Sequence, residues 1–136
     1  MKYLKQILIL FVSIVVLNVW LFRFNKSTIY RGGDAANMLE EFIVYGFDKP
    51  FLYLIGGLKI VAAVGLLIGL IYNKLILPCS SIIGLLMLGA IIMHFRVSDE
   101  IHKFFPAGLM LLSCITIIFI SNKSKNKVVW YNLDNK

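Results

Sequence analysis

The sequence predicts an all-α integral membrane protein, a four-helix bundle with a short amphipathic interfacial helix between its first and second spans. The composition supports this class, because 60% of the 136 residues are hydrophobic and only 15% are charged, whereas globular proteins are typically about 45–50% apolar and about 25% charged. The chain also contains four apolar runs, each close to the roughly 20 residues that a helix needs to cross a bilayer. We therefore expect a single membrane domain over residues 1–136.

The first apolar run, at about residues 4–22, follows Lys2 and Lys5 and so resembles the start of a secretory signal peptide. A cleavage site requires small residues after the apolar core. This run instead ends in bulky side chains, Trp20 among them. We therefore expect an uncleaved first span rather than a removed signal, with Trp20 and other boundary aromatics anchored at the membrane interface.

The other three spans are expected at about residues 50–72, 75–95 and 104–121. Each has a proline near its start, and Pro50 and Pro78 lie in the first turn, where a helix tolerates proline. Only Asn73 and Lys74 separate the second and third spans, and residues 96–103 separate the third and fourth. Neighbouring spans joined this closely must run antiparallel.

The longest connection, between the first two spans, is predicted to contain a short helix at about residues 34–46. Asp34 can cap this helix, its apolar positions recur every three or four residues, and Gly46 can end it. About a dozen residues cannot span a bilayer. The helix is therefore expected to lie in the interface or to cover one mouth of the bundle.

The distribution of lysine and arginine predicts the orientation. Apart from Lys59, the cations are Lys2, Lys5, Lys74, Lys123, Lys125, Lys127 and Lys136 on one side, and Arg23, Lys26, Arg31, Lys49, Arg96 and Lys103 on the other. The first group occupies short segments, whereas the second group is spread over the longest loop. We therefore expect a bacterial inner-membrane protein with both termini in the cytoplasm. The excess of basic residues is thus expected to interact with the headgroups of the lipid bilayer. Nucleic-acid binding is not expected, because the sequence has no basic stripe with interleaved aromatic residues.

Lys59 is the charged residue inside the second apolar run. It begins about 13 Å below the membrane surface, where a charge costs roughly 2.5–3.5 kcal/mol. Small residues that suit helix packing occur around it and beyond it at Gly56, Ala62, Ala63, Gly65 and Gly69. Two alternatives follow. Lys59 either extends back toward the outer surface, or it is a buried cation that pairs with a substrate anion, a quinone carbonyl or a carboxylate.

A polar cluster follows the third span, with His94, Arg96 and Asp99 at its start. His94 comes after an apolar run, so its ring is expected inside the membrane boundary, where it can exchange protons near neutral pH. The histidine spacing does not match a metal site, and none is expected. The cluster is either a polar loop, in which Arg96 and Asp99 form a helix-end ion pair, or part of an outer opening beneath the short helix. Lys59, His94, Arg96 and Asp99 are thus the candidate ligand or partner residues.

Short motifs in a fixed order resemble a known family. They comprise Tyr-Gly-Phe-Asp-Lys-Pro-Phe at 45–51, Gly-Gly-Leu-Lys-Ile at 56–60, Gly-Leu-Leu-Ile-Gly at 65–69, His-x-Arg-x-x-Asp at 94–99 and Phe-Pro-Ala at 105–107. Over roughly residues 30–115 this arrangement is similar to the DoxX-like family of small four-helix membrane proteins. Its name derives from a subunit of a thiosulfate:quinone oxidoreductase, and related families are linked to redox maturation, solute responses and chaperoning of membrane proteins. Members often carry a carboxylate where this chain has Lys59.

The resemblance implies an accessory or structural partner of a membrane or periplasmic system, and the sequence shows no paired nucleophile and base that would indicate catalysis. The alternative is the membrane subunit of a quinone-linked oxidoreductase, in which Lys59 and His94 contact the quinone head. No cofactor motif is evident in the sequence, and quinone is the cofactor that this alternative implies. A small-solute transporter is disfavoured, because four spans seldom enclose a path without forming a homo-oligomer.

Overall fold

The structure, a computed structural model, describes residues 1–134. Four helices are long and apolar enough to cross a membrane, which confirms the predicted all-α fold with four spans. They are α1 (Lys2–Leu17, continued by a π-helical turn at Asn18–Phe22), α3 (Lys49–Ile68), α4 (Ile76–Arg96, preceded by a 3-10 turn at Asn73–Leu75) and α5 (Ile101–Asp134); a shorter helix, α2 (Met38–Val44), precedes α3.

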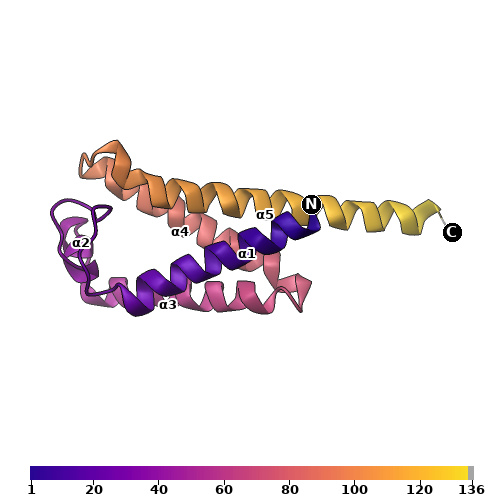
Figure 1. The fold of residues 1–136 in the computed structure, drawn as a ribbon, viewed down its shortest axis with the longest axis horizontal. Coiled ribbons are helices and arrows are strands. Elements are labelled where there is room, and N and C mark those ends of the chain that lie inside the picture. The colour runs from indigo at the N-terminus through magenta and orange to yellow at the C-terminus, as the bar shows by residue number, and fades with distance from the viewer. Residues whose placement is uncertain (135–136) are drawn as a thin grey trace.

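The four long helices pack in a ring. Helix α1 contacts α3 and α5, and α4 also contacts α3 and α5. Figure 1 shows α2 and the turn between α4 and α5 at one end of the bundle, here called the α2 end. The start of α1, the turn between α3 and α4, and the middle of α5 lie at the other end, here called the lysine end (Figure 1).

The bundle is apolar on both its inner and outer faces. Ile9, Leu52, Ile83 and Ile117, one from each long helix, are fully buried, while many equally large apolar side chains point outward and are exposed. A helix that is hydrophobic all round belongs in a core or in a bilayer. The outward faces therefore suit contact with lipid.

Small residues let α3 approach its neighbours closely. Ala63 is fully buried. A Cβ atom added at Gly65 would lie 2.6 Å from Cys79 Sγ, and one added at Gly69 would lie 2.8 Å from Ile76 Cγ1. Both contacts are with α4, so larger side chains on this face of α3 would push the two helices apart.

The short helix begins later than the sequence suggested. Its cap is Asn37, whose Oδ1 accepts a hydrogen bond of 2.9 Å from the backbone N–H of Glu40, and not Asp34. The Glu40 side chain in turn accepts from Asn37 Nδ2 and from the backbone N–H of Ala36, in the manner of a capping box. Helix α2 is therefore only 7 residues long.

Helix α5 is longer at both ends than the predicted span of 104–121. It begins at Ile101, so Pro106 lies inside the helix rather than in its first turn. It continues past the apolar run to Asp134, and its part suited to a membrane is Ile101–Asn126. The added residues are rich in lysine, which favours helix in water, so hydropathy alone did not mark the helix end.

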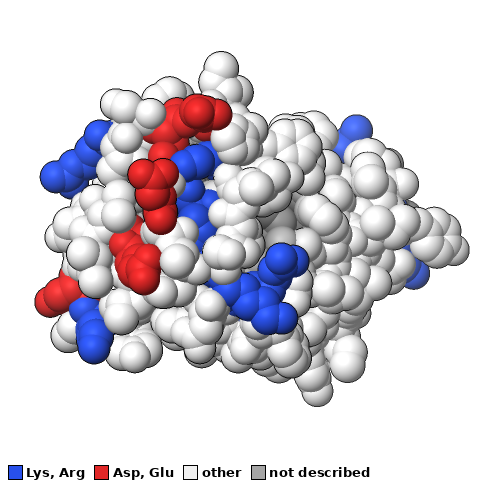
Figure 2. All heavy atoms as spheres, turned by 60° about the vertical axis from the view of Figure 1, so that its left-hand side comes forward, with Lys and Arg blue, Asp and Glu red and all other residues white. Residues whose placement is uncertain are grey.

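The charges divide unevenly between the two ends. Of the seven acidic residues, six belong to segments at the α2 end: Asp34, Glu40, Glu41, Asp48, Asp99 and Glu100. Figure 2, which brings this end forward, shows acidic and basic side chains gathered there on an otherwise largely uncharged face. Among the cations predicted to be cytoplasmic, Lys136 and the side chain of Lys127 lie outside the described residues; Lys2, Lys5 and Lys74 lie in segments at the lysine end.

Candidate functional site

A cavity of about 770 Å³ lies inside the half of the bundle nearest α2. All four long helices, α2 and the segment before α2 contribute to its wall. The wall is mostly apolar, with residues such as Val19, Phe42, Ile55, Met87 and Met110. Its volume falls within the roughly 300–1,000 Å³ typical of small-molecule sites, and such sites are usually apolar with a few well-placed polar groups.

Lys59 is one of the polar groups in this wall. Its Nζ lies 5.3 Å from the centroid of the Trp20 ring, within the range of a cation–π contact. No described carboxylate lies within ion-pair distance of Nζ, and none of the described residues forms a hydrogen bond with it. The ammonium group is therefore held by an aromatic face and retains its donors for another molecule.

The side chain of Trp20 is buried within the protein, so it does not face lipid as an interfacial anchor, although its position near a predicted boundary suggested that role. The residue is only 7% exposed and packs against Phe24 and Phe42. Its ring crosses Gly56 so closely that a Cβ atom there would lie 2.5 Å from the indole. Gly56 thus makes room for the ring on which Lys59 rests.

His94 is the second polar group in the cavity wall. It is 5% exposed, and its Nδ1 lies 2.7 Å from Asp99 Oδ2. Because a carboxylate only accepts hydrogen bonds, Nδ1 carries a proton. The other ring nitrogen, Nε2, has no hydrogen-bond partner among the described residues. In the neutral ring it is an acceptor.

Asp99 is held in its ionised form by three donors. Oδ1 accepts from the backbone N–H of Gly33 at 2.9 Å and from Lys103 Nζ at 3.4 Å, while Oδ2 faces His94. Burial alone raises the pKa of Asp99, but the hydrogen bonds from His94, Gly33 and Lys103 outweigh it and lower the pKa below its usual value. Lys103 Nζ also donates to Gly33 O at 2.6 Å, which ties the segment before α2 to the start of α5.

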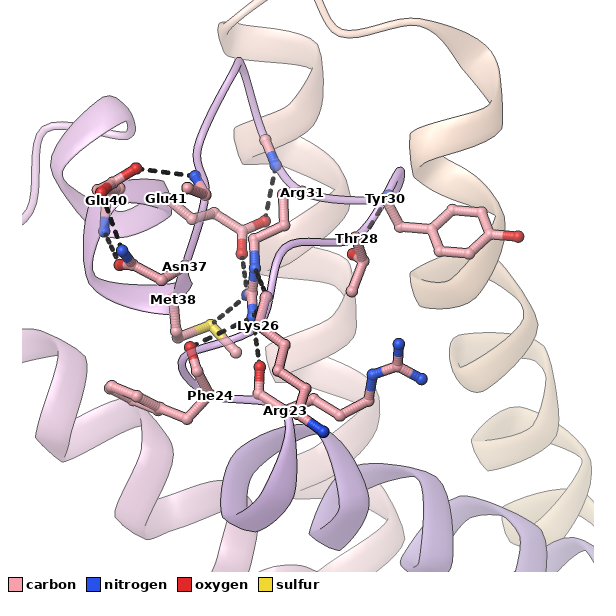
Figure 3. Close-up of polar contacts among 12 residues, drawn as sticks. Arg23, Phe24, Lys26, Thr28, Tyr30, Arg31, Asn37, Met38, Glu40 and Glu41 are labelled. Carbon is pink, nitrogen blue, oxygen red and sulfur yellow. Dashed lines mark hydrogen bonds and ion pairs between the residues drawn. The ribbon is translucent and has the colours of Figure 1, made fainter.

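Arg31 and Glu41 form a buried ion pair near these residues. Arg31 Nη1 lies 2.8 Å from Glu41 Oε2, and both residues are buried. The guanidinium also donates to the carbonyl oxygens of Arg23 at 2.7 Å and Lys26 at 3.0 Å (Figure 3). Glu41 Oε1 accepts from the backbone N–H of Gly32 at 2.8 Å. Such saturation with hydrogen bonds is what makes a buried ion pair tolerable.

Tyr45 links the ion pair to the histidine. Its hydroxyl donates to Glu41 Oε1 at 3.0 Å and lies 3.4 Å from His94 Nδ1. Burial, and then the charge and hydrogen bond of Glu41, raise the pKa of Tyr45, so the phenol stays protonated. The result is a continuous polar network that spans α2, α4 and α5. Its members are Arg31, Glu41, Tyr45, His94, Asp99 and Lys103.

The four candidate residues separate in the structure. Lys59 and His94 line the same cavity, and Asp99 lies behind His94. Arg96, by contrast, is exposed, does not line the cavity and forms no ion pair with Asp99 in the described part of the chain. Residues two positions apart in an α-helix differ by about 200° around the helix axis. Arg96 therefore points away from the side of α4 that buries His94.

Sequence reasoning missed the other members of the network. Glu41 on α2 and Tyr45, the residue that caps the end of α2, are four residues apart and therefore share one face, which was a readable signal. Arg31 lies in a segment without regular structure, and no periodicity points to its partner. Within the described residues no group of three or more His, Cys, Asp or Glu side chains could hold a metal ion.

A protein-family model described as the DoxX-like family matches residues 14–116. This range contains the cavity wall and every member of the polar network. Neither the curated proteins nor the solved structures gave a match to the chain.

Proposed function

The chain belongs to the DoxX-like family of membrane proteins, and on this basis we propose that it is an accessory protein of the bacterial inner membrane that binds a quinone-type molecule. The observation that supports the proposal is the cavity of about 770 Å³, whose mostly apolar wall includes the side chains of Lys59 and His94. Each of these two side chains, neither of which is exposed, has a nitrogen atom, Nζ and Nε2, without a hydrogen-bond partner among the described residues. The protein would hold the quinone for a membrane or periplasmic partner, or for a second copy of itself.

The two nitrogen atoms suit the two ends of a quinone head. In the reduced form, one phenolic oxygen would accept from the Lys59 ammonium, and the hydroxyl at the other end would donate to His94 Nε2 where that nitrogen carries no proton. The oxidised form has only carbonyl oxygens and would use the bond from Lys59 alone. Lys59 lies ten residues, about 15 Å, from the start of α3, and His94 lies two residues, about 3 Å, from the end of α4. The side chain of Lys59 leans toward the α2 end, which brings Nζ closer to the level of His94.

The remaining wall fits the apolar parts of such a molecule. Aromatic and aliphatic residues from four helices would cover the ring, and the lower wall would receive the start of an isoprenoid tail. A bound quinone supplies two-electron redox chemistry. The role proposed for this chain is to bind and orient the quinone. This is the binding part of the alternative function, that of a quinone-linked oxidoreductase subunit.

Trp20 provides the assay. The chain has two tryptophans, Trp20 and Trp130, so Trp130→Phe leaves Trp20, beside Lys59, as the one fluorophore. Titration with decylubiquinone in detergent is expected to quench it to saturation. Lys59→Met should weaken binding roughly 10-fold or more, since hydrogen bonds to charged groups contribute about 1.5–3 kcal/mol.

The matched control is Lys74→Met, which removes the same charge at the lysine end, outside the cavity. It should leave the binding constant unchanged. Quenching that rises linearly without saturation, as simple partition into the micelle would give, or equal binding by the Lys59→Met protein, would refute the proposal.

A further inference from the structure

A second pocket, of about 560 Å³, opens at the lysine end, opposite the cavity described above. The first turn of α1, the turn between α3 and α4, and α5 form its wall. Three lysines line it: Lys2, Lys5 and Lys123. Lys2 and Lys5 are three residues apart and so share a face of α1, while Lys123 comes from α5, which packs against α1.

These three ammonium groups have no ion-pair partner among the residues that the structure describes. None of them forms an ion pair or a side-chain hydrogen bond with another described residue. Six of the seven acidic residues occupy segments at the opposite end of the bundle. The pocket therefore concentrates positive charge that the described part of the protein does not neutralise.

The ends of the membrane-length helices place the pocket at the level expected for lipid headgroups. The membrane-length helical segments begin at Lys2 and at Asn73, and the segment in α5 ends at Asn126, close to Lys123. Asn73 and Ser124 add neutral hydrogen-bonding groups, and buried Ile120 supplies an apolar surface in the wall. Basic pockets between spans at this depth are suited to phosphate groups above acyl chains.

We propose that this pocket binds the phosphate group of an anionic phospholipid. Lys2 and Lys5 would contact the phosphate from α1 and Lys123 from α5, so one headgroup would bridge the first and last spans. The glycerol and the start of an acyl chain would pack beside Ile120. This site is separate from the cavity near α2 and does not depend on the function proposed for it.

Native mass spectrometry of the full chain in detergent tests the proposal. The probes are dioleoyl phosphatidylglycerol and dioleoyl phosphatidylcholine, which share their acyl chains and differ in net charge. The anionic lipid should bind more tightly. Each lysine near an anionic headgroup contributes about fivefold, so Lys2→Gln, Lys5→Gln and Lys123→Gln together should weaken its binding roughly 100-fold.

The control is a second triple variant with the same change in charge but at lysines outside the pocket, Lys49→Gln, Lys74→Gln and Lys125→Gln. It should weaken binding by less than about threefold. Because Lys2 and Lys5 also influence membrane insertion, the single variant Lys123→Gln provides a second measurement, with an expected loss of about fivefold. Equal losses in both triple variants would show a diffuse basic surface and overturn the proposal.

Inorganic phosphate distinguishes the source of the ligand. If the lipid is the ligand, millimolar phosphate should not displace phosphatidylglycerol from the unmodified protein. Displacement by phosphate, or equal binding of the two lipids, would overturn the assignment to an anionic phospholipid.

Discussion

Replacing Glu41 with glutamine tests whether the buried ion pair holds the α2 end together. Glu41 accepts hydrogen bonds from Arg31 Nη1 at 2.8 Å, from Gly32 N at 2.8 Å and from Tyr45 Oη at 3.0 Å. The single carbonyl oxygen of glutamine can keep the bonds from Gly32 and Tyr45. Its NH₂ group would then face the guanidinium, so Arg31 would remain buried as an unpaired cation.

The expected loss follows from that geometry. Removing one partner of a buried ion pair typically costs about 3–5 kcal/mol. The carbonyls of Arg23 and Lys26 continue to accept from Arg31, so we expect Glu41→Gln to reduce the free energy of unfolding by about 2–4 kcal/mol. Chemical unfolding in detergent, monitored by circular dichroism, measures it.

Two variants make this prediction decisive. Glu40→Gln changes an exposed carboxylate on the same helix that takes part in the capping box, and it should cost less than about 1 kcal/mol. The double variant Arg31→Met with Glu41→Leu removes both charges and should cost less than the sum of the single changes. Additive losses, or a Glu41→Gln protein within about 0.5 kcal/mol of the parent, would refute the reasoning.

Three further predictions concern charge. Lys59→Leu should keep or raise thermal stability while it weakens quinone binding roughly 10-fold or more, as expected for Lys59→Met. Lys59→Glu should bind worse than Lys59→Leu if the ligand oxygen is negatively polarised, and equal binding by the two variants contradicts the pairing. Reporter fusions after Lys127 should report the cytoplasm and fusions within residues 23–49 the opposite side, and the reverse result would invert the orientation. The pKa of Asp99 in the folded protein lies below its ordinary value of 3.8. The stability that the ionised carboxylate contributes is therefore fully present at neutral pH and is lost as the pH falls through that lowered pKa. Asp99→Asn should lessen the loss of stability on acidification, which thermal unfolding at several pH values measures.

The spans could be predicted because transfer of apolar residues into the bilayer determines them. The helix ends depend on finer competition. Asp34 and Asn37 are both good caps, but only Asn37 is followed three residues later by a glutamate, Glu40, whose side chain returns a hydrogen bond to the cap residue in a variant of the capping box. That pairing was readable from the sequence and would have placed the start of α2 correctly.

The candidate site was partly predictable from the periodicity of buried residues along the helices. Trp20 continues the four-residue spacing of the buried residues Val12 and Val16, so its burial follows from periodicity even though it lies near the end of a span. His94 lies seven residues after buried Met87 and thus on the same face of α4. Arg31 is different, because the path of an irregular segment decides its partner, and the sequence contains no period that encodes that path.

In the function proposed here, the polar network would also decide which ligand the cavity recognises. Ionised Asp99 fixes the proton of His94 on Nδ1, and Tyr45, kept protonated by burial and by Glu41, donates away from the ring to Glu41. The network therefore uses its own donors and acceptors internally and leaves an acceptor at His94 Nε2, while Lys59 supplies a donor over Trp20. A ligand that offers both a hydroxyl and a carbonyl or phenolic oxygen satisfies both nitrogens, whereas a plain hydrocarbon leaves both unsatisfied at a cost of about 1–3 kcal/mol each. This difference is what would let the cavity select a quinol from the much larger pool of acyl chains around it, whereas a quinone, which has no hydroxyl, would satisfy Lys59 alone.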